Sequence, residues 1–164
     1  IALPDAVNKA GKLLKSLGMG QQLDELNLQM NRAAEAAVPQ AQKWLTQSIE
    51  TMSVQDAKSI LQGGDDSVTQ FFASKTREPL TVEFMPTVKQ SLEKLGVVNQ
   101  FNAVAVKLTG MGLLDKDKAK LETHVTAKTL DGLYFMIGEE EKKIRQNPAQ
   151  AGSAILTKVF GALR

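Results

Sequence analysis

The spacing of the apolar side chains constrains the fold most, because they recur every three to four residues between proline and glycine positions. This period matches one face of an α-helix, which makes a turn every 3.6 residues. No segment alternates apolar and polar residues over the length of a strand, as a half-buried β-strand would. The pattern therefore predicts an all-α fold without a sheet.

Proline, glycine and capping residues divide this pattern into separate helices. Ser53 and Asp56 have the spacing of a capping box, and Gly63-Gly64 is expected to end the short helix that they open. Pro79 is expected to open a longer helix, which kinks at Pro86. The longest helix is expected over Leu121 to Gln146, and a last one is expected to hold Ile155, Leu156, Val159 and Phe160.

The connections between these segments look short, which favours antiparallel neighbours in one bundle. A chain of 164 residues can bury a sizeable core, and its 43% apolar and 23% charged residues are typical of globular proteins. We therefore expect a single domain over residues 1–164, a compact bundle of about seven to nine short-to-medium helices.

The charge and cysteine content exclude several classes of function. Twenty basic and eighteen acidic residues give a net charge of +2, which is too small and too interspersed to indicate nucleic acid or an anionic membrane surface. No apolar run approaches the roughly 20 residues of a transmembrane helix. Because cysteine is absent, disulfides, thiolate catalysis and sulfur-ligated zinc are excluded.

Motifs for catalysis or cofactor binding are missing from the sequence. His124 is the only histidine, and no serine lies in a nucleophile elbow or a Ser-x-x-Lys motif. Gly18-Met19-Gly20 lacks the following glycine and the strand context of a phosphate-binding loop. We therefore expect no cofactor and no resident metal, and an enzyme is the less favoured hypothesis.

Asp65 and Asp66 follow Gly63-Gly64, and this arrangement is typical of a helix stop followed by an acidic N-cap. The helix dipole favours such carboxylates at the start of the next helix. A metal bound by the two side chains is the alternative, although their spacing does not match a calcium loop of the EF-hand kind.

Three adjacent glutamates, Glu139, Glu140 and Glu141, follow the most apolar stretch of the chain. They are expected either to lie on a solvated face, with Glu139 paired to Lys143 and Glu141 to Arg145 at i,i+4 spacing, or to include one buried carboxylate. Glu141 continues the inward-facing series of this helix. The arginine expected to pair with a buried glutamate is Arg32 or Arg77.

Two further features indicate close packing or a binding surface. Gly132 lies inside the longest expected helix, where glycine costs about 1 kcal/mol relative to alanine. We therefore expect another helix or a ligand to approach the backbone closely there, or the helix to kink. The methionines fill core gaps, or line a groove for an acyl chain or a partner helix. They are Met19, Met30, Met52, Met85, Met111 and Met136.

Several stretches, in order along nearly the whole chain, carry a family resemblance. They are Leu3–Ala6, Met30–Glu35, Gly63–Phe72, Lys75-Thr76, Pro79-Leu80, Leu130–Ile137, Glu139–Arg145 and Asn147-Pro148. In these stretches the chain resembles a bacterial family known as domain of unknown function 4197, which has no established activity. Its members look like exported proteins with a signal peptide or lipoprotein leader. The resemblance implies a periplasmic or cell-envelope location, with residues 1–164 as the mature core without its leader.

The resemblance supplies no catalytic residues, but it indicates polar positions that belong to the family motifs and could meet in space. Together with Arg77, they are the candidates for a ligand site or a buried polar network. These candidates are Asn31, Arg32, Asp65, Asp66, Thr76, Arg77, Asp131, Glu139, Glu140 and Glu141.

Three functional hypotheses follow from these observations. The favoured one is a non-enzymatic envelope domain that binds a protein partner, or an apolar small molecule held between helices. The second is a metal-binding protein or hydrolase-like enzyme that uses Asp65, Asp66 and a glutamate of 139–141. The third is a purely structural envelope protein.

Overall fold

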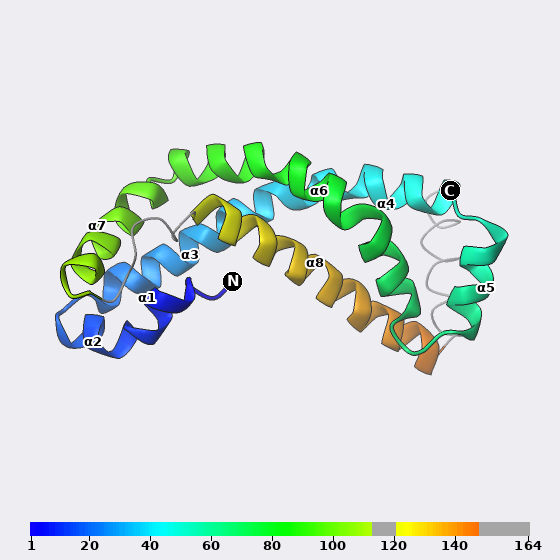
Figure 1. Cartoon of the computed structure of the whole chain (residues 1–164), viewed down its shortest axis with the longest axis horizontal. Coiled ribbons are helices and arrows are strands. Elements are labelled where there is room, and N and C mark those ends of the chain that lie inside the picture. The colour runs from blue at the N-terminus through cyan, green and yellow to red at the C-terminus, as the bar shows by residue number, and fades with distance from the viewer. Residues whose placement is uncertain (113–120, 148–164) are drawn as a thin grey trace, which may run out of the picture.

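The computed structural model describes residues 1–112 and 121–147, and helices are the only regular elements in these two ranges. The all-α prediction is therefore confirmed. Three helices dominate the arrangement in Figure 1: α3 (Gly20–Ala37), α6 (Ser67–Lys94) and α8 (Leu121–Gln146). Helices α3 and α8 cross near the middle of the molecule, and α6 arches over both.

Short helices surround these three. The chain begins with α1 (Asp5–Lys9) and α2 (Gly11–Ser16). Pro39 lies in a 3₁₀ turn (Val38–Gln40) that joins α3 to α4 (Ala41–Glu50). The predicted capping box of Ser53 and Asp56 is confirmed at the start of α5 (Val54–Gln62).

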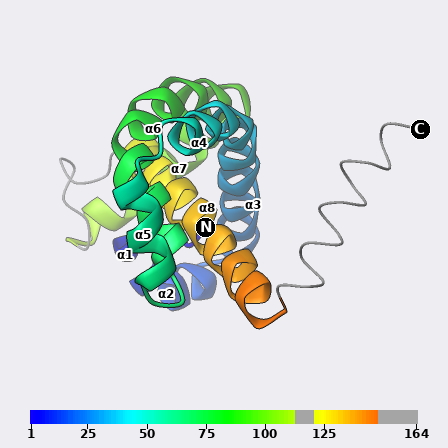
Figure 2. The same cartoon turned by 90° about the vertical axis from the view of Figure 1, so that its right-hand side faces the viewer.

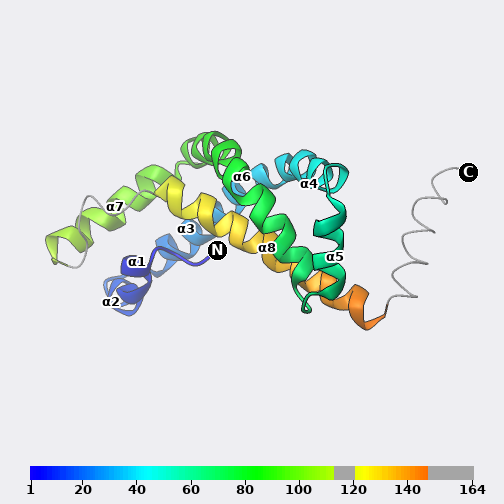
Figure 3. The same cartoon turned by 45° about the vertical axis from the view of Figure 1, so that its right-hand side comes forward.

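Helix α6 differs from the prediction, because Pro79 and Pro86 both lie inside one continuous helix of 28 residues. Pro79 therefore does not open a helix, and α6 rather than the 26-residue α8 is the longest described element. The axis of α6 bends visibly (Figures 1 and 3), as expected of a helix that contains prolines, which lack an amide hydrogen and clash with the preceding turn.

The boundaries of the later helices follow the sequence more closely. Gly96, with φ +69° in the left-handed region, directly precedes α7 (Val97–Gly110). The bounds predicted for α8 are confirmed. The last predicted helix, with Ile155, Leu156, Val159 and Phe160, lies outside the described residues.

The core is one continuous cluster of apolar side chains from helices α1 to α4 and α6 to α8. Helix α6 contributes Leu80, Phe84, Val88 and Leu92, each at most 1% exposed, at the spacing of one helical face. Each such burial contributes about 1.5–3 kcal/mol. Beyond Tyr134, along α8, the apolar side chains are only partly buried or exposed. The core thus thins out toward the end of the molecule where α5, the start of α6 and the end of α8 meet, and where Figure 2 views the molecule end-on.

No helix in the two described ranges combines the length and the apolar character needed to cross a membrane.

Candidate binding site

The buried carboxylate of Glu141 holds the end of α8 against the beginning of α6. Its Oε1 accepts a hydrogen bond from the Val68 amide at 2.9 Å, and its Oε2 accepts from the Thr69 amide at 2.8 Å and the Thr69 hydroxyl at 2.7 Å. These amides belong to the first turn of α6, where no partner within the helix exists. Glu141 therefore caps α6 from a distant part of the chain.

Arg145 completes this cap from one turn further along α8. Its Nε and Nη2 donate to Glu141 Oε1 at 3.0 and 2.8 Å, and Nη2 also donates to Ser67 Oγ at 2.6 Å. The Ser67 hydroxyl in turn donates to the Ile60 carbonyl at the end of α5. One chain of hydrogen bonds thus joins α5, α6 and α8.

The electrostatics of Glu141 favour the ionised carboxylate. Burial acts to raise its pKa, but the hydrogen bonds from Val68, Thr69 and Arg145 outweigh burial, and the pKa lies below its ordinary value. A carboxylate that is ionised and fully hydrogen-bonded is unsuited to act as a general acid. The contacts of Glu141 are those of a structural residue that joins α8 to α6.

The ion pairs expected for the three glutamates are only partly confirmed. The pairing of Glu141 with Arg145 is confirmed, whereas Arg32 and Arg77, the partners expected for a buried glutamate, are wrong. Arg145 is close because i,i+4 residues of one helix are neighbours. Glu139 pairs with Lys142 at 2.9 Å instead of Lys143, and Lys143 pairs with Glu140 at 2.6 Å.

A second group of motif residues joins α6 to α8 nearer the core. The Thr76 and Tyr134 hydroxyls lie 2.8 Å apart, and Thr76 is 1% exposed. Arg77 donates to Asp131 at 2.7 Å while its guanidinium stacks 5.2 Å from the centre of the Tyr134 ring. The hydrogen bond from Arg77 is the main cause that lowers the pKa of Asp131. Thr76, Arg77 and Asp131 therefore form a polar seam between the two helices.

Other candidate residues lie apart from this seam. Asp65 and Asp66 are exposed at the start of α6, and Asp66 accepts a hydrogen bond from Gln70 at 2.8 Å instead of capping the helix with its side chain. Asn31 donates to the Asn27 carbonyl within α3, and Arg32 is exposed on the same helix. Within residues 1–112 and 121–147, no three histidine, aspartate or glutamate side chains gather where they could hold a metal ion.

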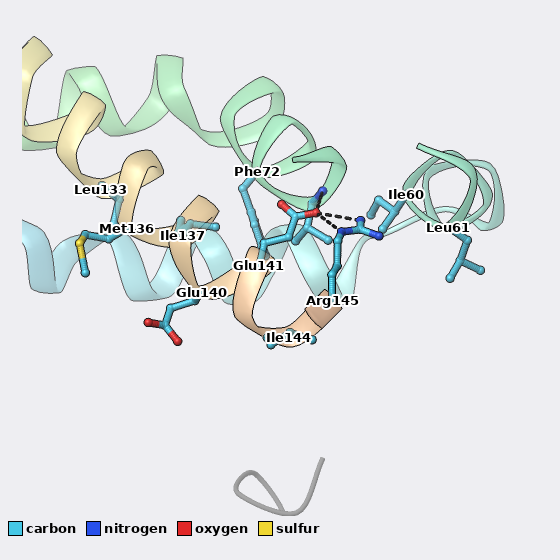
Figure 4. Close-up of a pocket in the computed structure, with 11 residues that line it drawn as sticks. Ile60, Leu61, Phe72, Leu133, Met136, Ile137, Glu140, Glu141, Ile144 and Arg145 are labelled. Carbon is cyan, nitrogen blue, oxygen red and sulfur yellow. Dashed lines mark hydrogen bonds and ion pairs between the residues drawn. The ribbon is translucent and has the colours of Figure 1, made fainter. Parts of the chain in front are cut away.

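An apolar groove of about 540 Å³ lies beside the Glu141 cap, between α5, α6 and α8 (Figure 4). Several of its side chains face solvent: Leu61 is 81% exposed, Met136 57% and Ile144 46%. The groove is therefore an open surface feature and not an enclosed cavity. Glu140, Glu141 and Arg145 are its charged members, and its apolar members are Ile60, Leu61, Val68, Phe72, Leu133, Met136, Ile137 and Ile144.

The sequence contained only part of the signal for this groove. Helical periodicity places Ile137 and Ile144 on the same side of α8 as Glu141, but no described helix covers that side at the end of α8. Of the six methionines, Met136 lines the groove, whereas Met19 and Met30 are buried in the core. The close approach of another helix expected at Gly132 is wrong, because nothing among the described residues would lie within 4 Å of a Cβ there.

The sequence model of a family described as "Protein of unknown function (DUF4197)" matches residues 1–161. Neither a curated protein nor a solved structure matches the chain.

Proposed function

The chain belongs to this family of unknown function, and from the geometry we propose that it is a non-enzymatic binding domain. In this proposal the groove between α5, α6 and α8 receives one amphipathic helix of a protein partner. Burial of apolar surface drives the association.

The observation that carries the proposal is the open apolar groove itself. An exposed, contiguous apolar surface rimmed by charged groups is typical of an interaction site. Met136 and Ile144 present their side chains to solvent along one face of α8, and Leu61 does so across the groove on α5. A soluble domain loses little by exposing single apolar side chains, but a lined groove of them indicates a missing partner.

The openness of the groove favours a helix over a small apolar molecule. Small-molecule sites bury most of the ligand surface, roughly 70–90%. An amphipathic helix needs to bury only one face and keeps its polar face in water. The charged side chains at the groove, such as Glu140, can contact that polar face.

The polar cap supports this role by keeping the walls of the groove fixed. Ser67, Glu141 and Arg145 tie α5, α6 and α8 together, and each of these helices contributes apolar lining. A preformed site binds more tightly because less side-chain and loop ordering is needed on association. The motif carboxylates thus have a structural use that requires no metal and no catalysis.

The proposed location is the bacterial periplasm or cell envelope. It rests on the resemblance of the motif stretches to those of exported proteins. Fractionation of the producing cells, with detection of the chain in periplasmic, membrane and cytoplasmic extracts, tests it. Recovery in the cytoplasmic extract alone would contradict it.

Native mass spectrometry of protein purified from the cells that naturally produce it tests the proposed function. We expect a discrete protein-sized added mass on the unchanged chain and on the matched control Phe135→Lys, which alters an exposed residue outside the groove. Met136→Lys, which places a charge in the groove, should lose that mass. A lipid-sized added mass would mean that the groove binds an apolar small molecule and not a partner helix. A bare chain in all three samples would contradict the binding role.

A further inference from the structure

Among the described residues that line the groove, Glu140 is the one charged side chain that the polar cap does not use. The other two, Glu141 and Arg145, are hydrogen-bonded to each other and to the start of α6. The carboxylate of Glu140 has only Lys143 as a partner among the described residues, and both side chains are mostly exposed. An exposed ion pair of this kind contributes little to stability. Glu140 is therefore available to a binding partner.

This carboxylate lies in the middle of an apolar stripe on α8. Met136, Glu140 and Ile144 have the spacing i, i+4 and i+8, so they share one face of the helix. Figure 4 shows these three side chains pointing away from α6, on the same side of α8. At 1.5 Å per residue, Met136 and Ile144 lie about 12 Å apart along the helix axis, with Glu140 halfway between them. An occupant that covers both apolar side chains therefore also covers the carboxylate.

Covering a carboxylate without a partner of opposite charge opposes binding. A charged group that is taken out of water loses its hydration, and this loss is offset only when a paired group replaces the water. We infer that the groove recognises an amphipathic helix that carries a basic side chain, best an arginine, between two apolar anchors. This inference rests on the proposed helix-binding role and identifies the polar group of the partner that meets Glu140.

Arginine suits this position better than lysine. Its guanidinium can donate two parallel hydrogen bonds to one carboxylate, whereas the ammonium of lysine acts as a point charge. The methylene groups of an arginine can lie against Met136 or Ile144 while its charged end reaches Glu140. Lys143 can turn into solvent when the arginine takes its place, because its side chain is already 67% exposed.

The spacing of the stripe defines the pattern expected in the partner. The lining of α8 extends from Leu133 to Ile144, about 16 Å at 1.5 Å per residue, so a helix laid along it makes about three turns of contact. Apolar residues at i and i+7 of such a helix would meet Met136 and Ile144, and a base at i+3 or i+4 would meet Glu140. The pattern holds for both directions of the partner helix, because Glu140 lies halfway between the two apolar side chains.

Selection from a displayed library of helical peptides tests the inference. The library has leucine at i and i+7 and all residue types at the positions between them. The bait is the full chain, either unchanged, with Glu140→Lys in the groove, or with the matched charge reversal Glu139→Lys outside the lining. With the unchanged chain and Glu139→Lys, we expect a base at i+3 or i+4 to be enriched at least about tenfold over aspartate and glutamate. With Glu140→Lys, the preference should reverse.

The outcomes separate this inference from the proposed function, with Met136→Lys as a further bait that places a charge in the apolar stripe. Helices that Met136→Lys rejects, but that show no preference for a base, overturn the inference and leave the helix-binding role standing. Loss of the preference in Glu139→Lys as well as Glu140→Lys also overturns it, because long-range charge and not contact would then select the base. Failure to enrich any helix that Met136→Lys rejects contradicts the proposed function, and the inference with it. Equal thermal unfolding midpoints of the four chains show that the substitutions leave the fold intact.

Discussion

At the residue scale, Glu141 is the residue that joins the end of α8 to the start of α6 beside the groove. Its carboxylate is only 3% exposed and accepts hydrogen bonds from the first turn of α6 and from Arg145. Removal of this side chain would leave two α6 amides without their acceptor and a partly buried arginine without its partner. Unpaired buried groups of this kind are among the most destabilising.

We therefore predict that Glu141→Ala lowers the free energy of unfolding by about 3 kcal/mol, the range found when a buried charged hydrogen-bond partner is removed. Urea unfolding at neutral pH, followed by circular dichroism, measures this change. Glu140→Gln, at an exposed neighbour, is the matched control and should unfold like the unchanged chain. Equal midpoints for Glu141→Ala and the control would contradict the structural role of the cap.

The same residue gives the protein a pH dependence with a defined sign. Because the pKa of Glu141 is lowered in the folded chain, its contribution to stability is present above its ordinary pKa of 4.5. That contribution is lost as the pH falls through the lower, folded-state pKa. Glu141→Gln should lose less stability between pH 5 and pH 3 than the unchanged chain, as measured by urea midpoints at about those two pH values. A parallel decline in both proteins would contradict the assignment.

Substitution of glycine by alanine is expected to have opposite effects on stability at Gly132 and at Gly63. Gly132 lies exposed inside α8 with nothing described within 4 Å of a Cβ, so Gly132→Ala should stabilise the protein by about 1 kcal/mol. At Gly63 a Cβ would lie 2.5 Å from Ser67 Cβ and 2.8 Å from the Ser59 carbonyl, so Gly63→Ala should destabilise it. Differential scanning calorimetry would show the midpoint rise in the first variant and fall in the second. A fall at Gly132 would indicate an unseen close neighbour.

Local patterns in the sequence could predict some of these residue contacts but not others. Helix periodicity placed Glu141 on an inward face, and i,i+4 spacing identified Arg145. The amides that donate hydrogen bonds to Glu141 lie 72 and 73 residues earlier, and no local pattern encodes that distance. Local sequence favours a cap by the side chain of Asp65 or Asp66, but the distant Glu141 caps α6 instead.

At the scale of elements, polar contacts at defined positions along the two helices fix the pairing of α6 with α8. Thr76 donates its hydroxyl hydrogen to the Phe72 carbonyl, so the Tyr134 hydroxyl must be the donor in the hydrogen bond to Thr76. This buried bond, together with Arg77 and Asp131, sets which turn of α8 meets which turn of α6. Satisfied buried polar groups can specify such a register.

A double-mutant cycle tests the Thr76–Tyr134 contact. Tyr134→Phe should lower the free energy of unfolding by about 1 kcal/mol, a typical net value for one hydrogen bond. In the Thr76→Val background the same change should have almost no effect, because the acceptor is already gone. Additive losses would mean that the two hydroxyls do not interact in solution.

The path of α6 illustrates why element boundaries were harder to predict than element type. Pro79 suits a first helical position, so the sequence offers no local sign that the helix expected after Asp65 and Asp66 continues through this proline. The continuity comes from packing, since Thr76, Leu80 and Phe84 lie on one buried face at i, i+4 and i+8 across the proline. Tertiary burial therefore outweighs the local preference.

At the scale of the whole molecule, the apolar core and the groove differ in what covers them. The cluster around α3, α6 and α8 is closed, whereas the face of α8 that carries Met136 and Ile144 is open among the described residues. Both surfaces have the same helical periodicity in sequence. Periodicity can predict that a face is apolar, but the assembly of helices decides whether that face is core or binding surface.

Thiol labelling inside living cells tests the binding role most directly. The chain has no cysteine, so Met136→Cys supplies a unique thiol in the groove, and Phe135→Cys supplies a matched thiol outside it. We predict slow labelling by a membrane-permeant reagent in the cells, where the partner helix fills the groove, and fast labelling of the same chain after purification to a bare mass. Fast labelling in both settings, at the rate of Phe135→Cys, would contradict the proposal that the groove is a binding site.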